Sequence, residues 1–171
     1  LSESPDAASK TLQKELEDLS ISARRGVTRQ LAYVVLITSG KKPDQLWLRA
    51  SRSPKAFQDL VDSVPRVEGA KVRALFHPFV KRLLHDLPKF QAPLSVSSAQ
   101  SIRISAIRAL ASIPGREIES YRTLVPFVKD RNYREVAVTA LSRIPKTGIP
   151  KEEVAPLVGS LTQYIASVPP K

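Results

Sequence analysis

Apolar residues recur along most of this chain at the three- and four-residue spacing of an amphipathic helix. The clearest example follows an i, i+1, i+4, i+5, i+8 order and consists of Val136, Ala137, Ala140, Leu141 and Ile144. No stretch of useful length alternates between apolar and polar residues, which is the period of a half-buried strand. The pattern therefore predicts an all-α fold.

Proline, glycine and serine divide this pattern into separate helices. Ser4, Pro5 and Asp6 are typical of a helix start, because serine caps the first turn and proline suits the first helical position. Residues 69–87 are predicted to form one long helix, and residues 88–98 the longest loop. Taken in twos, the expected helices form pairs over residues 5–39, 43–64, 69–113 and 116–144, followed by a last helix over 148–168.

The second helix of several pairs repeats one sequence pattern. Residues 102–114 match residues 133–145 at an offset of 31, and residues 28–36 match residues 133–141 at an offset of 105. The first helices share a proline followed by two apolar residues, at Pro78, Pro126 and Pro156. Such a proline costs little in the first turn of a helix and kinks the helix if it lies deeper. A single pair cannot bury its apolar face alone, so we expect the pairs to stack on one another.

These motifs resemble the HEAT repeat, a family of two-helix repeats. The characteristic positions are a proline in the first helix, an aspartate in the turn, and an arginine, two alanines and a leucine in the second helix: Pro126, Asp130, Arg134, Ala137, Ala140 and Leu141. The resemblance implies a right-handed α-solenoid of about four helical pairs plus a terminal helix, forming a single domain over residues 1–171. It also implies structural roles for Asp130, Arg134, Pro78, Pro126 and Pro156.

A narrower resemblance covers three runs, at residues 51–65, 72–78 and 144–171, which are similar to HEAT-like segments of large exported proteins of planctomycete-type bacteria. Those proteins carry cytochrome c, propeller or cupredoxin-like domains elsewhere. The resemblance implies a spacer or docking module beside redox domains and favours a periplasmic or extracytoplasmic location. The chain begins at Leu1 and contains no Met, so we expect it to be a fragment of a larger protein.

The net charge of +11 is unevenly distributed. Residues 1–20 carry −3, whereas residues 21–58 carry +7. A basic excess favours acidic protein surfaces or nucleic acid as partners. The basic region can equally be a solvated surface, or one matched to an acidic neighbouring part of the same chain. The contact candidates in this region are Arg24, Arg25, Arg29, Lys41, Lys42, Arg49 and Arg52.

No constellation of catalytic residues stands out. The chain has no Cys, which excludes disulfides, thiolate metal sites and a cysteine nucleophile within it. His77 and His85 are too few to hold zinc, and nothing in the sequence orients either as part of a triad. The longest apolar run covers residues 31–37, far short of the roughly 20 residues that span a bilayer. We therefore expect no enzyme activity, no metal and no cofactor.

The sequence favours a protein-interaction or scaffold module, whose partners are other domains of the parent protein or acidic protein surfaces. Solenoids present a long curved surface formed by the second helices. Arg108 and Thr139 are the contact candidates there, and the surface is expected to include some of Gln30, Tyr33, Ser105, Arg108, Ser112, Glu135, Thr139 and Ser142. The alternative is a nucleic-acid-binding solenoid that uses the basic 21–58 region.

Overall fold

The protein folds into a stack of helices in a computed structural model that describes residues 5–90, 93–145, 149, 151–152, 154–156, 158–159 and 162. The described residues form helices and connecting turns and contain no strand, which confirms the predicted all-α class. The helices in chain order are α1 (Pro5–Ser22), α2 (Gly26–Thr38), α3 (Pro43–Ala50), α4 (Pro54–Ser63), the 3-10 helix η1 (Val64–Arg66), α5 (Ala70–Ala74), α6 (His77–Leu83), α7 (Val96–Ser112), α8 (Glu117–Leu124), the 3-10 helix η2 (Val125–Val128) and α9 (Arg134–Arg143).

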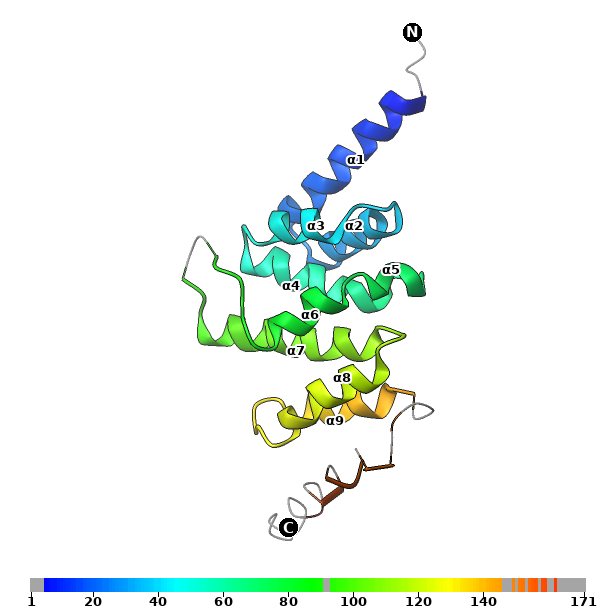
Figure 1. Ribbon diagram of the computed structural model, residues 1–171. Coiled ribbons are helices and arrows are strands. Elements are labelled where there is room, and N and C mark those ends of the chain that lie inside the picture. Colours follow the sequence, from blue (N-terminus) through cyan, green and yellow to red (C-terminus); the bar gives the residue numbers. More distant parts are fainter. Residues whose placement is uncertain are drawn as a thin grey trace.

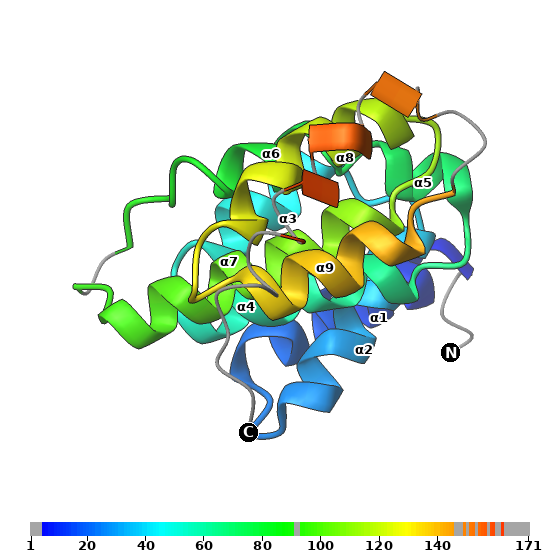
Figure 2. The ribbon, with the colours of Figure 1, turned by 90° about the horizontal axis from the view of Figure 1, so that it is seen from below.

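The helices form two layers that run the length of the stack (Figure 1). One layer consists of α2, α4, α7 and α9, each of which contacts the next in that order. The other contains α3, α6 and α8, which pack on α4, α7 and α9 respectively. Seen along the stack in Figure 2, α9 lies nearest the viewer, with α7, α4 and α2 behind it. Helix α1 packs against α2 at the opposite end.

Local sequence signals explain where most helices begin and end. Proline occupies the first turn of α3 and of α4, where its missing N–H has no partner to lose. The Ser95 side chain caps α7 by accepting a hydrogen bond from the Ser98 amide at 3.1 Å. Gly40 and Gly115 have φ values of 85° and 81°, a left-handed conformation that glycine adopts without strain. Gly40 lies just after the end of α2, and Gly115 lies just after the end of α7.

The long helix predicted over 69–87 is wrong, because the chain there forms the two short helices α5 and α6. Pro78 lies in the first turn of α6, and proline cannot continue a helix that arrives from the residues before it. The amides of Leu75 and Phe76 instead close tight turns onto the carbonyls of Val72 and Arg73. Pro126 has the same effect, since α8 ends at Leu124 and a 3-10 helix follows.

Two other predicted boundaries differ. Helix α7 begins at Val96, inside the segment 88–98 that was predicted to be a loop, because the Ser95 side chain caps its first turn. The last helix, expected over 148–168 and containing Pro156, falls largely on residues outside the described part. Its described members, at 151–152, 154–156, 158–159 and 162, are helical.

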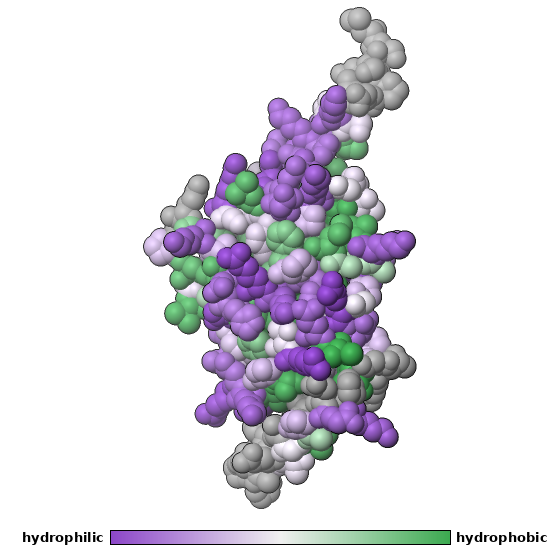
Figure 3. All heavy atoms as spheres, viewed as in Figure 1, coloured by the Kyte–Doolittle hydropathy of each residue, from purple (hydrophilic) through white to green (hydrophobic). Residues whose placement is uncertain are grey.

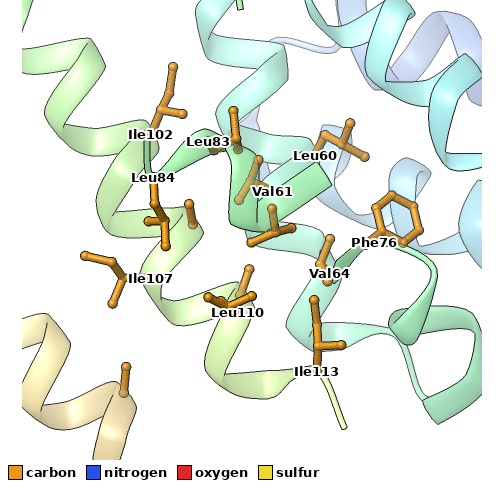
Figure 4. Close-up of a cluster of buried hydrophobic side chains, with 14 of the residues drawn as sticks. Leu60, Val61, Val64, Phe76, Leu83, Leu84, Ile102, Ile107, Leu110 and Ile113 are labelled. Atoms are coloured by element: carbon orange, nitrogen blue, oxygen red, sulfur yellow. The ribbon is translucent and has the colours of Figure 1, made fainter. Parts of the chain in front are cut away.

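A continuous hydrophobic core runs between the two layers. Figure 4 shows its middle section, where side chains from α4, η1, α6, α7 and the residues flanking α6 and α7 converge: Leu60, Val61, Val64, Phe76, Leu83, Leu84, Ile102, Ile107, Leu110 and Ile113. On the face shown in Figure 3, polar side chains dominate and hydrophobic ones form separate patches. The stack is therefore held together chiefly by apolar burial between successive pairs.

Truncating this core is expected to be costly. Leu110 is fully buried in α7, so Leu110→Ala should lower the free energy of unfolding by about 2–5 kcal/mol, through lost transfer energy and the cavity left behind. Val96 on the same helix is 86% exposed, and Val96→Ala should change the free energy of unfolding by no more than about 0.5 kcal/mol. Urea denaturation of both variants measures the difference; equal effects would contradict the assignment of the core.

Candidate functional site

Arg29, expected to contact a partner, is instead buried between helices. Its side chain is 4% exposed, and its Nε donates to Asp59 Oδ2 on α4 at 2.6 Å. Its Nη1 donates to the carbonyl oxygens of Ala23 and Arg24 at 2.5 and 3.3 Å. The second carboxylate oxygen of Asp59 accepts a hydrogen bond from Gln30 at 2.8 Å. Arg29 therefore joins the α1–α2 turn to α4 and is not available to a partner.

Arg134 makes the same backbone contacts in the last pair. Its Nε and Nη2 donate to the carbonyl oxygens of Val128 and Lys129, at 2.9 and 3.3 Å, which lie six and five residues earlier. The two carbonyls bound by Arg29 have the same sequence separations. Asp130 also acts within its turn, since its Oδ1 accepts a hydrogen bond from the Asn132 amide at 2.9 Å. The sequence repeat at an offset of 105 thus has a structural counterpart.

Two further basic candidates pair with the acidic first helix. Lys41 Nζ lies 2.5 Å from Glu17 Oε1, and Arg49 lies 3.1 Å from the other oxygen of that carboxylate. Arg49 also contacts Asp18 at 2.9 Å. These contacts join the negative segment 1–20 to the positive segment 21–58, so part of the basic excess is matched within the chain. Arg24, Arg25, Lys42 and Arg52 remain on the exposed surface.

A groove lies at the ends of the second helices α4, α7 and α9, where they meet α5 and α8. It has a volume of about 720 Å³ and is lined by four arginines and two carboxylates: Arg66, Arg73, Arg108, Arg143, Asp62 and Glu117. Arg108 and Arg143 also line an adjoining pocket of about 440 Å³ that contains Thr139. The structure therefore brings the two second-helix candidates, Arg108 and Thr139, to one surface.

The charges in this groove are not balanced internally. Within the described part of the chain, none of the four arginines that line it forms an ion pair with a carboxylate. Burial raises the pKa of Asp62, and the hydrogen bond from Ser105 and the charges of Arg108 and Arg66 offset that rise only in part. The groove thus presents a surplus of guanidinium groups, which bind carboxylate and phosphate oxygens in a two-pronged geometry.

Two of the residues named for the second-helix surface are buried, and other residues that line the groove were missed. Tyr33 and Ser105 are buried, at 0% and 2% exposure, because they face neighbouring helices. Arg66 and Arg143 were not recognised, although each lies near the end of a second helix, where cations suit the helix dipole. Arg73 could not have been found, because its helix was expected to continue through Pro78.

Neither histidine forms part of a recognisable catalytic or metal site. His77 is buried, its Nε2 lies 3.4 Å from Ser120 Oγ, and burial lowers its pKa. In the part of the chain that the structure describes, no three His, Cys, Asp or Glu side chains gather as metal ligands. None of the described helices combines the length and hydrophobicity needed to cross a membrane.

Comparisons of the chain with protein-family models, with curated proteins and with solved structures found no match. The resemblance to HEAT repeats therefore stays a prediction from the sequence.

The buried position of Arg29 predicts a large effect of its loss. Arg29→Gln should lower the free energy of unfolding by about 3–5 kcal/mol, because Asp59 is left buried without its charged partner. Arg24→Gln, on the adjoining exposed turn, should change it by about 0.5 kcal/mol or less. Replacing both partners, Arg29→Met with Asp59→Leu, should cost less than Arg29→Gln. Chemical denaturation gives all three values; a neutral Arg29→Gln would contradict the buried pair.

The lowered pKa of buried His77 predicts that the protein loses stability on mild acidification. Because its pKa is lowered from 6.5 in the folded state, the unfolded chain binds a proton first as pH falls. Stability should be fully present above about pH 7 and decline as pH falls through the lowered pKa. His77→Gln should flatten this part of the pH profile, whereas His85→Gln, at an exposed position, should leave it unchanged. Thermal melting as a function of pH distinguishes the two.

Proposed function

We propose that this chain is a non-catalytic protein-interaction module of a larger protein, built as a right-handed HEAT-like solenoid of about four helical pairs. The ordered contacts of α2, α4, α7 and α9 support this architecture, as do the matching contacts of Arg29 and Arg134. The groove at the ends of the second helices is its binding surface, and an acidic, extended segment of a partner protein or of another domain is its ligand.

The observation that carries this proposal is the surplus of arginines in the groove that form no ion pair with any described residue. Arg66, Arg73, Arg108 and Arg143 come from different elements and surround one cavity, opposite only two carboxylates. Guanidinium groups are weakly hydrated and planar, so they bind carboxylates at modest desolvation cost. An extended acidic peptide fits such a groove better than a compact ligand does, because the arginines are spread over three successive helical pairs.

The proposal predicts charge-dependent binding of an acidic peptide. A fluorescently labelled peptide rich in glutamate should bind, and the same peptide with glutamine in place of glutamate should not. Arg108→Gln and Arg143→Gln should each weaken binding about tenfold, equivalent to about 1.4 kcal/mol. Asp62→Asn should strengthen it, because it removes a carboxylate from the groove. Fluorescence anisotropy measures each affinity.

The control is the double variant Arg24→Gln, Arg25→Gln, which removes two positive charges, one more than either groove variant, from an exposed turn outside the groove. It should leave peptide affinity within about twofold, since it alters only long-range attraction, which salt screens. Equal binding of the glutamate and glutamine peptides, or equal effects of the groove and control variants, would count against the proposal.

Nucleic-acid binding is the second candidate function, favoured by the exposure of Arg24, Arg25, Lys42 and Arg52. The pairing of Arg29, Lys41 and Arg49 within the chain reduces the charge available for it. The two candidate functions can be distinguished by these variants. The affinity for duplex DNA should fall in the variant Arg24→Gln, Arg25→Gln, and the affinity for the acidic peptide should fall in Arg108→Gln. DNA affinity that falls steeply with salt and is lost in the former variant would favour this alternative.

A further inference from the structure

The groove is built on three helix ends that are equivalent in the repeat. Pro65, Pro114 and Pro145 all line it, and each lies two residues after the last residue of its second helix, α4, α7 or α9. The residue before each proline is a buried valine or isoleucine. The same short motif therefore recurs along the groove, once for each helical pair from the second to the fourth.

These helix ends lie at the spacing of packed helices. Helix α4 contacts α7, α7 contacts α9, and the three follow one another along the stack in Figure 1. The axes of packed helices lie about 8–10 Å apart. The groove therefore repeats about every 9 Å, and its three helix ends extend over roughly 16–20 Å.

Each of these three levels supplies an arginine to the groove. Arg66 ends η1, directly after α4, and Arg143 is the last residue of α9. Arg73 on α5 and Arg108 on α7 belong to the pair between them. Within the described part of the chain, none of these four side chains forms a hydrogen bond or an ion pair. The groove thus offers guanidinium groups to a ligand at three successive levels.

The spacing of the levels selects the conformation of an extended ligand. A polyproline II chain rises about 3.1 Å per residue with three residues per turn, so every third side chain points the same way, about 9 Å apart. In a β-strand, side chains on one face are about 7 Å apart, which falls out of step with the levels. The described residues also contain no strand, so they offer no sheet edge to a ligand that binds as an added strand.

We propose that the ligand of the groove is a segment in polyproline II conformation with an acidic residue at every third position, so that each helical pair binds one carboxylate. This inference rests on the proposed function, because it takes an acidic peptide as the ligand and adds the spacing of its charges. A polyproline II segment makes no internal hydrogen bonds and is already extended before it binds. Its binding therefore costs less conformational entropy than the ordering of a flexible chain does.

Three labelled peptides of identical composition, made only of glutamate and proline, provide the first test. Their glutamates stand at every third position, at every second position, or next to one another. The first peptide should bind the full chain about tenfold or more tightly than the other two, as measured by fluorescence anisotropy. Equal affinities of the three, or tighter binding of either of the other two, would overturn the spacing.

The same measurements separate this inference from the proposed function. If the three peptides bind equally, yet more tightly than counterparts with glutamine in place of glutamate, the spacing is wrong and the acidic-peptide groove stands. If the glutamine counterparts bind equally well, the proposed function fails, and this inference fails with it.

Double-mutant cycles test whether each glutamate meets its own level. Arg66 and Arg143 are exposed and come from the first and last levels, so replacing either with Gln leaves the core intact. Arg66→Gln should couple to loss of the glutamate at one end of the peptide, and Arg143→Gln to loss of the one at the other end. Within each coupled pair, the second change should weaken binding less than about twofold, instead of about tenfold.

Arg82→Gln is the matched control, because it removes one charge from an exposed position on α6 outside the groove. It should couple to neither end of the peptide. If Arg66→Gln and Arg143→Gln instead couple equally to both ends, the carboxylates do not bind level by level, and the inference is overturned.

Discussion

Each helical pair of this protein can bury its apolar faces only against its neighbours. Helix α4 is enclosed because α2 packs on one side and α7 on the other, and α7 is enclosed in the same way by α4 and α9. The fully buried side chains of the middle section, such as Leu60 and Leu110, depend on this arrangement. A stack of this kind is stabilised by the interfaces between adjacent pairs.

Polar contacts then determine how the pairs are set relative to one another. The buried pair of Arg29 and Asp59 gains little net stability over a well-packed apolar pair, because both charges lose their hydration. Its geometry is specific, however, since one guanidinium binds both the carboxylate of α4 and two carbonyl groups of the turn before α2. We infer that it fixes the register of α2 on α4. Arg134 binds two carbonyl groups at the corresponding positions of the last pair.

Some charged side chains of this protein form ion pairs with one another, whereas the arginines of the groove remain available to a ligand. Glu17 pairs with both Lys41 and Arg49, and Glu119 pairs with Lys81 and Arg116 on the first-helix side. These partly exposed pairs add little to stability, but they offset part of the local charge. The groove arginines have no such partners within the described residues, so their positive charges stay available in the groove. That distribution, more than the net charge, supports a role in binding.

The sequence by itself determined the helical class, most helix boundaries and the repeated unit, because helical periodicity and capping residues act over a few neighbouring positions. It also indicated that a proline deep in a helix would interrupt it, yet the apolar spacing of 69–87 concealed the break at Pro78. Only the tertiary structure decided which charges meet. The pairs Arg29–Asp59, Lys41–Glu17 and Arg49–Glu17 join residues 24 to 32 positions apart, and local pattern carries no information at that distance. The groove arises from the same long-range packing, because it depends on which helix ends lie next to one another.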